Sequence, residues 1–422
     1  MSRPPEPLEI WASPESTSAR IDAGRRRDQL AETGHQARAG DIDLLAGLGV
    51  SHARYPVLWE KTAPRDPREA DLSWAAPRLE RLREHGVAPI VTLLHHGSGP
   101  DGTSLIDPLF PELFARYART VAERFPWIER WTPINEPLTT ARFSTLYGHW
   151  YPNRVGDHAA FGRAVINQAR AIVRAMAEIR AVNPAAQLVL TEDLQAFHAD
   201  EAHAADGAHQ RERSFLSAET LMGRIVPGHA MHEYLTRACG VPAGELAWLV
   251  EHATAPDLMG WNYYTHSERV LLDRSGPHYA DVAAVYVRDV GISPRPLLRD
   301  AYRRLGLPLA LSEVHVDGDE EARCRWLAER WRDARALRDE GVPVLALGAW
   351  AAFGMVDWHS LLREREGYRE DGVFTFAAPD RVPQRTALTA LVERLVRGRE
   401  PETYAPGWWE GEERLIRGRT VA

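Results

Sequence analysis

The chain has 422 residues, of which 44% are hydrophobic, enough to build a large core. Its 51 basic and 59 acidic side chains give a formal net charge of −8, which argues against nucleic acid or an acidic membrane surface as the main partner. With two cysteines, no C-x-x-C and no apolar run of membrane-spanning length, we expect a soluble, cytoplasmic protein without a disulfide framework or a structural metal site.

Short apolar segments of β-type composition alternate with segments of helical periodicity along the whole chain. The expected strands are 8–13, 52–59, 88–96, 128–135, 187–192, 257–264, 308–313 and 345–353. Helical periodicity is clearest in 41–48, 110–125, 162–182 and 321–338. This alternation predicts an α/β fold, a (β/α)₈ TIM barrel in which residues 1–422 form a single domain. An open doubly wound sheet is the alternative, which the lack of a Gly-rich phosphate loop disfavours.

Long stretches without clear periodicity follow the fourth, fifth and sixth expected strands, at 138–160, 194–225 and 265–295. We expect them to form the wall of a pocket at the carboxyl-terminal face of the barrel. The run Arg25–Arg27 is expected to be a solvated surface near a helix start. The tail after Arg397 is expected to pack on the outside of the barrel.

Two glutamates stand at the carboxyl ends of expected strands. The stretch 131–137, WTPINEP, ends in Asn135-Glu136 and is closed by a proline, which disfavours the helical region for the residue before it, so Glu136 is expected to be extended. Glu313 ends the apolar run LPLALSE at 307–313. Catalytic groups of barrels sit at these strand ends, and two carboxylates facing each other across a sugar are the minimum equipment for cleaving a glycosidic bond.

Five motifs in order resemble those of glycoside hydrolase family 1, the β-glucosidase-like retaining enzymes. They are DIDLLAGLG at 41–49, RYPVLW at 54–59, NEP at 135–137, GWNYYT at 260–265, and the segment from Trp350 to Asp357 and Trp358. The resemblance runs nearly end to end. It implies a glycosidase that cleaves a β-glycosidic bond by double displacement through a covalent glycosyl-enzyme. Nothing in the sequence calls for a metal or an organic cofactor.

The resemblance also implies roles for the residues in these motifs. Glu136 corresponds to the general acid/base and Glu313 to the nucleophile. Arg54 and Tyr264 would hydrogen-bond Glu313 and keep it ionised, although a purely structural Arg54–Glu313 ion pair is equally compatible with the sequence. Asn135 would bind the sugar 2-hydroxyl.

Further residues are expected to bind the substrate. His96, or His95 if the alignment slips by one, would contact the 3-hydroxyl, and Trp350 would form the platform under the sugar ring. The rim would include Asn262, Asp357 and Trp358. Two carboxylates are additional candidates, Glu15 near the first strand and Glu192 at the end of the fifth. For Glu192 a salt bridge is an equal alternative.

The sequence departs from the family pattern around the sugar site. The nucleophile motif T-E-N-G is replaced by SEVH at 312–315, the third-strand motif by LHHGSGP at 94–100, and a sugar-binding glutamate by Asp357. The substrate is therefore expected to be a small-molecule or oligosaccharide glycoside whose sugar is not plain glucose. A transglycosylase with the same two glutamates and a sugar-binding pseudoenzyme remain alternatives. The sequence names neither the aglycone nor the oligomeric state.

Overall fold

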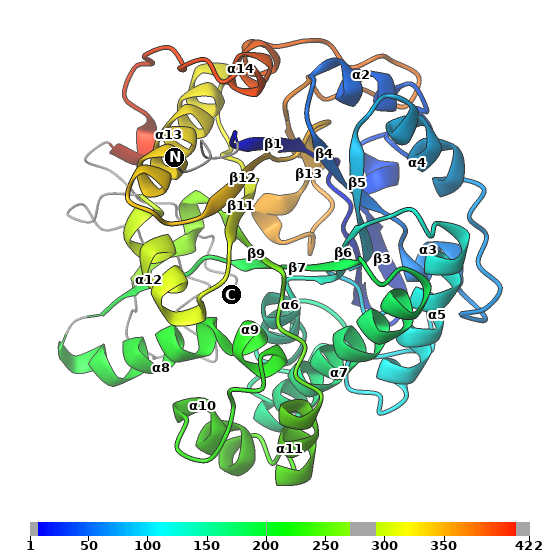
Figure 1. The fold of residues 1–422 in the computed structure, drawn as a ribbon, viewed down its shortest axis with the longest axis vertical. Helices are drawn as coiled ribbons and strands as arrows, with labels where there is room; N and C mark the ends of the chain where they lie inside the picture. The colour runs from blue at the N-terminus through cyan, green and yellow to red at the C-terminus, as the bar shows by residue number, and fades with distance from the viewer. Residues whose placement is uncertain (1–6, 200, 271–292, 411–422) are drawn as a thin grey trace, which may run out of the picture.

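A computed structural model describes residues 7–199, 201–270 and 293–410, and within them eight parallel strands close into a barrel (Figure 1). Each barrel strand pairs in parallel with the next one along the chain, and β1 closes the ring by pairing with both β12 and β4. The barrel strands are β1 (Glu9–Ala12), β4 (His52–Pro56), β5 (Ala88–His95), β6 (Arg130–Asn135), β7 (Gln187–Asp193), β9 (Leu258–Tyr263), β11 (Leu309–Val314) and β12 (Val344–Ala349). Every expected strand is present, which confirms the predicted (β/α)₈ barrel.

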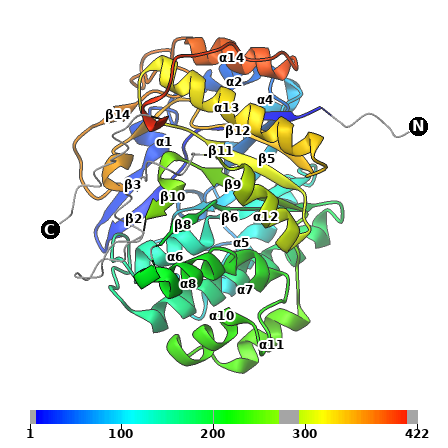
Figure 2. The ribbon, with the colours of Figure 1, turned by 90° about the vertical axis from the view of Figure 1, so that its left-hand side faces the viewer.

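Helices wrap the outside of the barrel (Figures 1 and 2). They include α2 (Asp41–Gly47), α4 (Ala75–Glu84), α5 (Phe110–Arg124), α7 (His158–Val182), α11 (Ala243–Glu251), α12 (Arg295–Leu305), α13 (Glu320–Asp339) and α14 (Ala387–Val396). In α5, Phe110, Phe114, Tyr117 and Val121 are fully buried at three- and four-residue intervals, so one stripe of the helix faces the core. No helix among the described residues is long and apolar enough to cross a membrane.

Further helices and three strand pairs complete the described fold. The helices are α1 (Gln29–Glu32), α3 (Trp59–Thr62), α6 (Pro137–Thr145), α8 (Ala204–Ser214), α9 (Leu216–Leu221) and α10 (Ala230–Glu233). The strands form three pairs: β2 (Ser18–Asp22) with β3 (Arg25–Asp28), β8 (Ala196–His198) with β10 (Glu268–Val270), and β13 (Met355–Val356) with β14 (Arg369–Glu370). Figure 2 shows β2, β3 and β14 on one side of the barrel.

The inside of the barrel is apolar in one half and polar in the other. Near the amino-terminal ends of the strands, one apolar cluster is drawn from the barrel strands alone, namely Trp11, Ile90, Val189, Leu258, Ala310 and Ala346. Toward the carboxyl-terminal ends, polar side chains are buried instead, namely Arg54, His95, Asn135, Thr191, Asn262, Ser312 and Glu313. The polar half is the place where a site can be built.

Expectations about three segments were wrong. The stretch 138–160 holds most of α6 and the start of α7, and the stretch 194–225 contains β8, α8 and α9. The α8 sequence AADGAHQRERS has too few apolar residues for its helical periodicity to be visible. The run Arg25–Arg27 forms β3, and Arg27 is only 1% exposed because its guanidinium pairs with Glu32 and Asp357. The expected stretch 265–295 lies largely outside the described residues.

The described part of the chain after Arg397, residues 398–410, packs on the outside of the barrel, as expected. Trp409 is buried against Trp326 of α13, with ring centroids 5.0 Å apart, and its indole N–H donates to Glu329 over 3.2 Å. Its neighbour Trp408 is 37% exposed. The two adjacent tryptophans therefore differ mainly in burial.

Trp409→Ala should lower the free energy of unfolding by about 3 kcal/mol, because it removes a large buried side chain and leaves a cavity. Trp408→Ala is the matched control and should cost less than about 1 kcal/mol. Urea denaturation followed by circular dichroism measures both. Equal losses for the two variants would contradict this account of the tail.

Candidate active site

The carboxyl group of Glu313 is held from two sides of the barrel. Glu313 lies in β11 and is 2% exposed. Arg54 of β4 donates from Nη2 to Oε1, and the Tyr264 hydroxyl, just after β9, donates to Oε2. Burial, followed by the charge of Glu313, raises the pKa of Tyr264 well above its usual value, so that its hydroxyl remains a donor. A guanidinium and a phenol thus donate to its two oxygens and fix the orientation of the carboxyl group.

The sequence predicts an extended backbone at Glu136, and this prediction is wrong. The residue is left-handed, with φ 46° and ψ 60°. Pro137 excludes the right-handed helical region for the residue before it but leaves the left-handed region open. Glu136 ends the pairing of β6, since its N–H donates to Thr191 over 3.1 Å, and its carbonyl accepts the Thr140 N–H of α6 over 2.9 Å. One residue thus turns the chain from strand into helix.

The carboxyl group of Glu136 has a different environment from that of Glu313. Among the described residues, this carboxyl group has one hydrogen bond, from Asn262 Nδ2 to Oε1, 2.6 Å long; His96 Nε2 lies 3.6 Å from Oε2. Burial and then the charges of Glu313, Asp193 and Glu192 raise the pKa of Glu136 well above its usual value, while the Asn262 hydrogen bond opposes the rise. Glu136 therefore stays protonated to a higher pH than an exposed glutamate does.

Asn135 lies between two histidines at the end of β5. Its Nδ2 is 3.1 Å from His95 Nε2 and 3.3 Å from His96 Nε2, and its Oδ1 accepts the Thr191 hydroxyl over 2.7 Å. Burial lowers the pKa of both imidazoles, that of His96 to about 3, so both rings are neutral. The sequence left the choice between His95 and His96 open; the structure brings both to this place.

Trp350, just after β12, lies beside His95 and Arg54. Its ring is stacked on His95 at 5.6 Å and 11°, and the Arg54 guanidinium lies 4.8 Å from its centre. The indole N–H donates to Glu15 Oε2 over 3.1 Å, and Glu15 Oε1 accepts the Thr17 N–H. Burial, with a contribution from the charge of Glu313, raises the pKa of Glu15 to about 7. Glu15 therefore lies at the same site, where it holds the edge of Trp350.

Asp357 and Trp358 follow β13 on the far side of His96. The two oxygens of Asp357 accept from Arg27 Nη2 over 2.9 Å and from the Tyr368 N–H over 2.7 Å. Trp358 packs edge-on against His96, with centroids 5.6 Å apart. Sequence reasoning missed Arg27, because a run of three arginines is typical of a solvated surface and nothing local marks one of them as buried.

Glu192 is buried, but its partners lie on the first turn of α6 and on α9. It accepts from the Leu138 and Thr139 N–H groups over 2.8 and 3.3 Å, and from the Thr139 and Ser217 hydroxyls, each over 3.0 Å. A carboxyl group at this position satisfies N–H groups that have no partner within the helix and offsets the helix dipole. Among the described residues Glu192 has no salt-bridge partner, and both of its oxygens accept hydrogen bonds from α6 and α9.

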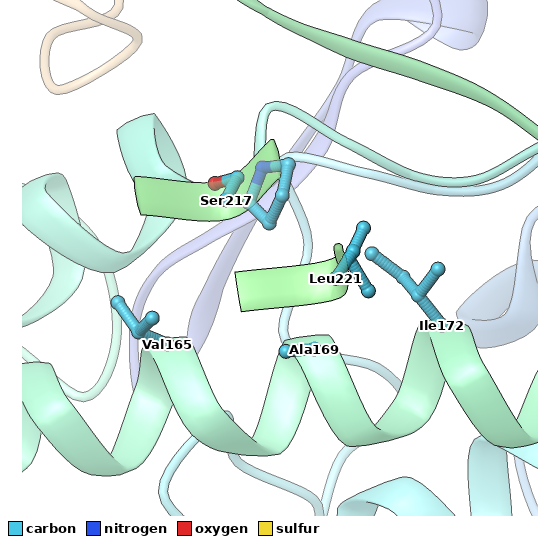
Figure 3. Close-up of a pocket in the computed structure, with 6 residues that line it drawn as sticks. Val165, Ala169, Ile172, Ser217 and Leu221 are labelled. Atoms are coloured by element: carbon cyan, nitrogen blue, oxygen red, sulfur yellow. The ribbon is translucent and has the colours of Figure 1, made fainter. Parts of the chain in front are cut away.

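A small apolar pocket lies next to this capping arrangement, between α6, α7 and α9 (Figure 3). It is lined by Pro137, Val165, Ala169, Ile172, Ser217 and Leu221. Its one polar side chain, Ser217, is already bonded to Glu192. The pocket contains no acid or base that could do chemistry, so the candidate site is the cluster around Glu136 and Glu313.

Two other groups at the site carried no signal in the sequence. The hydroxyls of Thr191 and Ser312 are buried in β7 and β11 and donate to Asn135 and Asn262, respectively. Ser and Thr inside a strand are common, and only the register of neighbouring strands brings them to an amide. A single sequence therefore cannot identify them.

A (β/α)₈ barrel with two buried glutamates at strand ends is an architecture that glycoside hydrolases use. The sequence model of the family described as glycosyl hydrolase family 1 matches residues 8–285, and the chain belongs to that family.

Curated relatives match only part of the chain. The putative β-glucosidase 17 of Oryza sativa subsp. japonica is 23% identical over 154 residues, which are 34% of this chain and 51% of the relative. β-Glucosidase 1B of Phanerodontia chrysosporium is 27% identical over 161 residues, 35% of this chain and 29% of the relative. The match thus spans about half or less of the length of these relatives.

Solved structures match nearly the whole chain. The family 1 β-glucosidase from Thermotoga maritima aligns with a TM-score of 0.77 at 17% identity, over 96% of this chain and 100% of that chain. The β-glucosidase from Thermotoga maritima in complex with cyclophellitol aligns with a TM-score of 0.76 at 17% identity, over 95% and 100%. At this identity the likeness establishes the fold.

Glu192→Ala should lower the free energy of unfolding by about 2–3 kcal/mol, because two buried N–H groups of α6 lose their acceptor. Glu178→Ala, at a side chain that is 43% exposed, is the control and should change stability by less than about 0.5 kcal/mol. Thermal unfolding and steady-state kinetics are measured together. An unchanged stability with a raised KM would instead make Glu192 a substrate contact.

Proposed function

We propose that this protein is a retaining glycosidase that cleaves a β-glycosidic bond, with Glu313 as the nucleophile and Glu136 as the general acid/base. The observation that carries the proposal is that two buried carboxyl groups have different hydrogen-bond partners. Glu313 receives a guanidinium and a phenol, whereas Glu136 receives one amide N–H and has a raised pKa. Two carboxyl groups whose environments push their protonation apart are the usual mark of a nucleophile and an acid.

In the first step, a carboxylate oxygen of Glu313 attacks the anomeric carbon while the bond from that carbon to the leaving oxygen breaks. Glu136 gives its proton to the leaving oxygen, so the aglycone departs as an alcohol and the sugar becomes an ester of Glu313. Arg54 and Tyr264 aim the carboxylate, and both are already bonded to it. No reorganisation of these partners is required before the attack.

In the second step, Glu136 is ionised and takes a proton from water. The water oxygen attacks the anomeric carbon, the ester bond to Glu313 breaks, and the sugar leaves with its original configuration after two inversions. The raised pKa of Glu136 supports both directions of transfer, because a carboxyl that titrates nearer neutrality can serve as acid and then as base.

The substrate we propose is a small-molecule or oligosaccharide β-glycoside. Asn135 is the contact for the sugar 2-hydroxyl, His95 and His96 are contacts for the 3-hydroxyl, and Trp350 is the platform under the ring. Asp357 differs from the family's glutamate in being shorter, and its two oxygens already accept N–H groups from Arg27 and Tyr368. It therefore offers less to a sugar hydroxyl at the far end of the site, which favours a sugar that lacks or rearranges a hydroxyl there.

Glu313→Ala should reduce turnover by on the order of 10³-fold or more, because no covalent intermediate can form. Added azide should restore part of the turnover and give a glycosyl azide of inverted configuration, because one displacement replaces two. The test uses release of nitrophenol from the best of a panel of nitrophenyl glycosides. Glu123→Ala, at a side chain that is 56% exposed, is the matched control and should keep wild-type turnover.

Glu136→Ala should impair a different step of the reaction from Glu313→Ala. Substrates with activated leaving groups need no proton, so the first step should persist while the glycosyl-enzyme accumulates, seen as a burst of nitrophenol. Azide should speed the second step and give a product of retained configuration. Full wild-type turnover in this variant or in Glu313→Ala would remove the substituted residue from the mechanism and point to another carboxyl group, whereas absent turnover in the wild type would favour a sugar-binding protein.

The specificity of the site should not favour glucose. Each hydroxyl contact that Asp357 no longer supplies costs on the order of 1–3 kcal/mol, so kcat/KM on nitrophenyl β-glucoside should lie below that on another sugar in a panel including deoxy and branched sugars. Turnover of the glucoside equal to or better than that of every other sugar would refute this expectation.

A further inference from the structure

Two buried hydroxyls each bond to the amide of an asparagine at the site. Ser312 in β11 donates to Asn262 Oδ1 over 2.6 Å, and Thr191 in β7 donates to Asn135 Oδ1 over 2.7 Å. Both hydroxyl-bearing residues and both asparagines are 3% exposed or less. In each pair the amide oxygen is occupied, so the amide nitrogen points the other way. The amide nitrogen of Asn262 faces Glu136, and that of Asn135 faces His95 and His96.

A glycine makes room for both hydroxyl-bearing side chains. Gly260 lies on β9 between β7 and β11, and a Cβ there would stand 2.7 Å from Ser312 Oγ and 2.9 Å from Thr191 Cγ2. Real Cβ atoms do not approach other atoms this closely. A side chain at residue 260 would therefore collide with the Ser312 hydroxyl and with the methyl group of Thr191.

We infer that Ser312 is a positioning residue for proton transfer: its hydroxyl fixes the orientation of the Asn262 amide, and the amide in turn fixes which oxygen of Glu136 carries the proton. The inference rests on the proposed role of Glu136. Because Oε1 accepts the Asn262 N–H over 2.6 Å, the exchangeable proton belongs on Oε2. Without the Ser312 hydroxyl, the amide can rotate and present its oxygen to Glu136 instead.

The rotated amide has a definite electrostatic consequence. An N–H donated to a carboxyl favours its ionised form, so Asn262 holds the pKa of Glu136 down against burial and its acidic neighbours. A carbonyl oxygen in the same place would accept the carboxyl proton and favour the neutral form. The groups that face Glu136 from the surrounding elements are Asn262, His96, Tyr264, Glu313, Asp193 and Glu192. Within this group, the Ser312 hydroxyl bonds directly to Asn262.

The test compares Ser312→Ala with Ser312→Thr, which keeps the hydroxyl. Two aryl glycosides of the same sugar serve as substrates: a phenyl glycoside, which needs a proton to leave, and a dinitrophenyl glycoside, which does not. Thr132→Val is the matched control, because the Thr132 hydroxyl is buried in β6 with no hydrogen-bond partner among the described residues. The readout is kcat/KM as a function of pH.

For Ser312→Ala, kcat/KM on the phenyl glycoside should fall about tenfold at neutral pH, and the falling limb at high pH should move to higher pH. On the dinitrophenyl glycoside the loss should be less than about twofold, since general acid catalysis is not needed. Ser312→Thr should return both kcat/KM and the pH of the falling limb to their wild-type values, and Thr132→Val should change neither. If Ser312 had only a structural role, its loss would lower kcat/KM equally on both glycosides and would not shift the pH at which kcat/KM falls.

An unmoved limb and an equal loss on both substrates in Ser312→Ala would overturn the inference. Should that variant fail to fold, Ser312→Cys, whose thiol is only a weak donor, should shift the limb in the same direction by a smaller amount, and no shift in that variant would overturn the inference. A failure of the proposed function would give a different result. If Glu136 is not the acid/base, the pH profile of kcat/KM for Glu136→Ala would keep the falling limb of the wild type at high pH. The two failures are thus distinguishable in one set of profiles.

Discussion

The site depends on the constraint that two carboxyl groups cannot both be ionised in one buried place without compensation. Taking a charge out of water costs several kcal/mol unless a partner is supplied. The barrel brings one guanidinium, that of Arg54, to the pair, and it is bonded to Glu313. Among the described residues Glu136 has no cationic partner, because the imidazole of His96 at 3.6 Å is neutral, and the pKa of Glu136 is raised. The division of roles between the two glutamates follows from that asymmetry.

The backbone supports this arrangement by turning sharply where strands end. Three residues of the site, His96, Glu136 and Asp357, have positive φ angles of 54°, 46° and 57°. Such a conformation costs a non-glycine residue on the order of 1 kcal/mol or more and persists where surrounding contacts fix it. At Glu136 the contacts are the pairing with β7 and the first turn of α6, which Glu192 caps. Glu192 thereby helps to hold the turn at Glu136.

Much of the fold could be predicted because its signals are local. Apolar runs and helical periodicity locate the eight strands and the long helices, and the family motifs coincide with strand ends. Arg27, Thr191 and Ser312 could not be found, because their importance depends on which residue of another strand lies opposite. The left-handed Glu136 was missed for a related reason: proline excludes one region of backbone space, but the tertiary contacts choose among those that remain. The roles of the site residues stay predictions.

The claim that these two glutamates perform a double displacement is tested most directly by the configuration of the first product. Proton magnetic resonance can follow the anomeric signal during rapid hydrolysis of the best β-glycoside, before the free sugar equilibrates. The account predicts that the β anomer appears first and converts slowly to the mixture. Initial appearance of the α anomer would mean a single displacement by water and would contradict the assignment of Glu313 as the nucleophile.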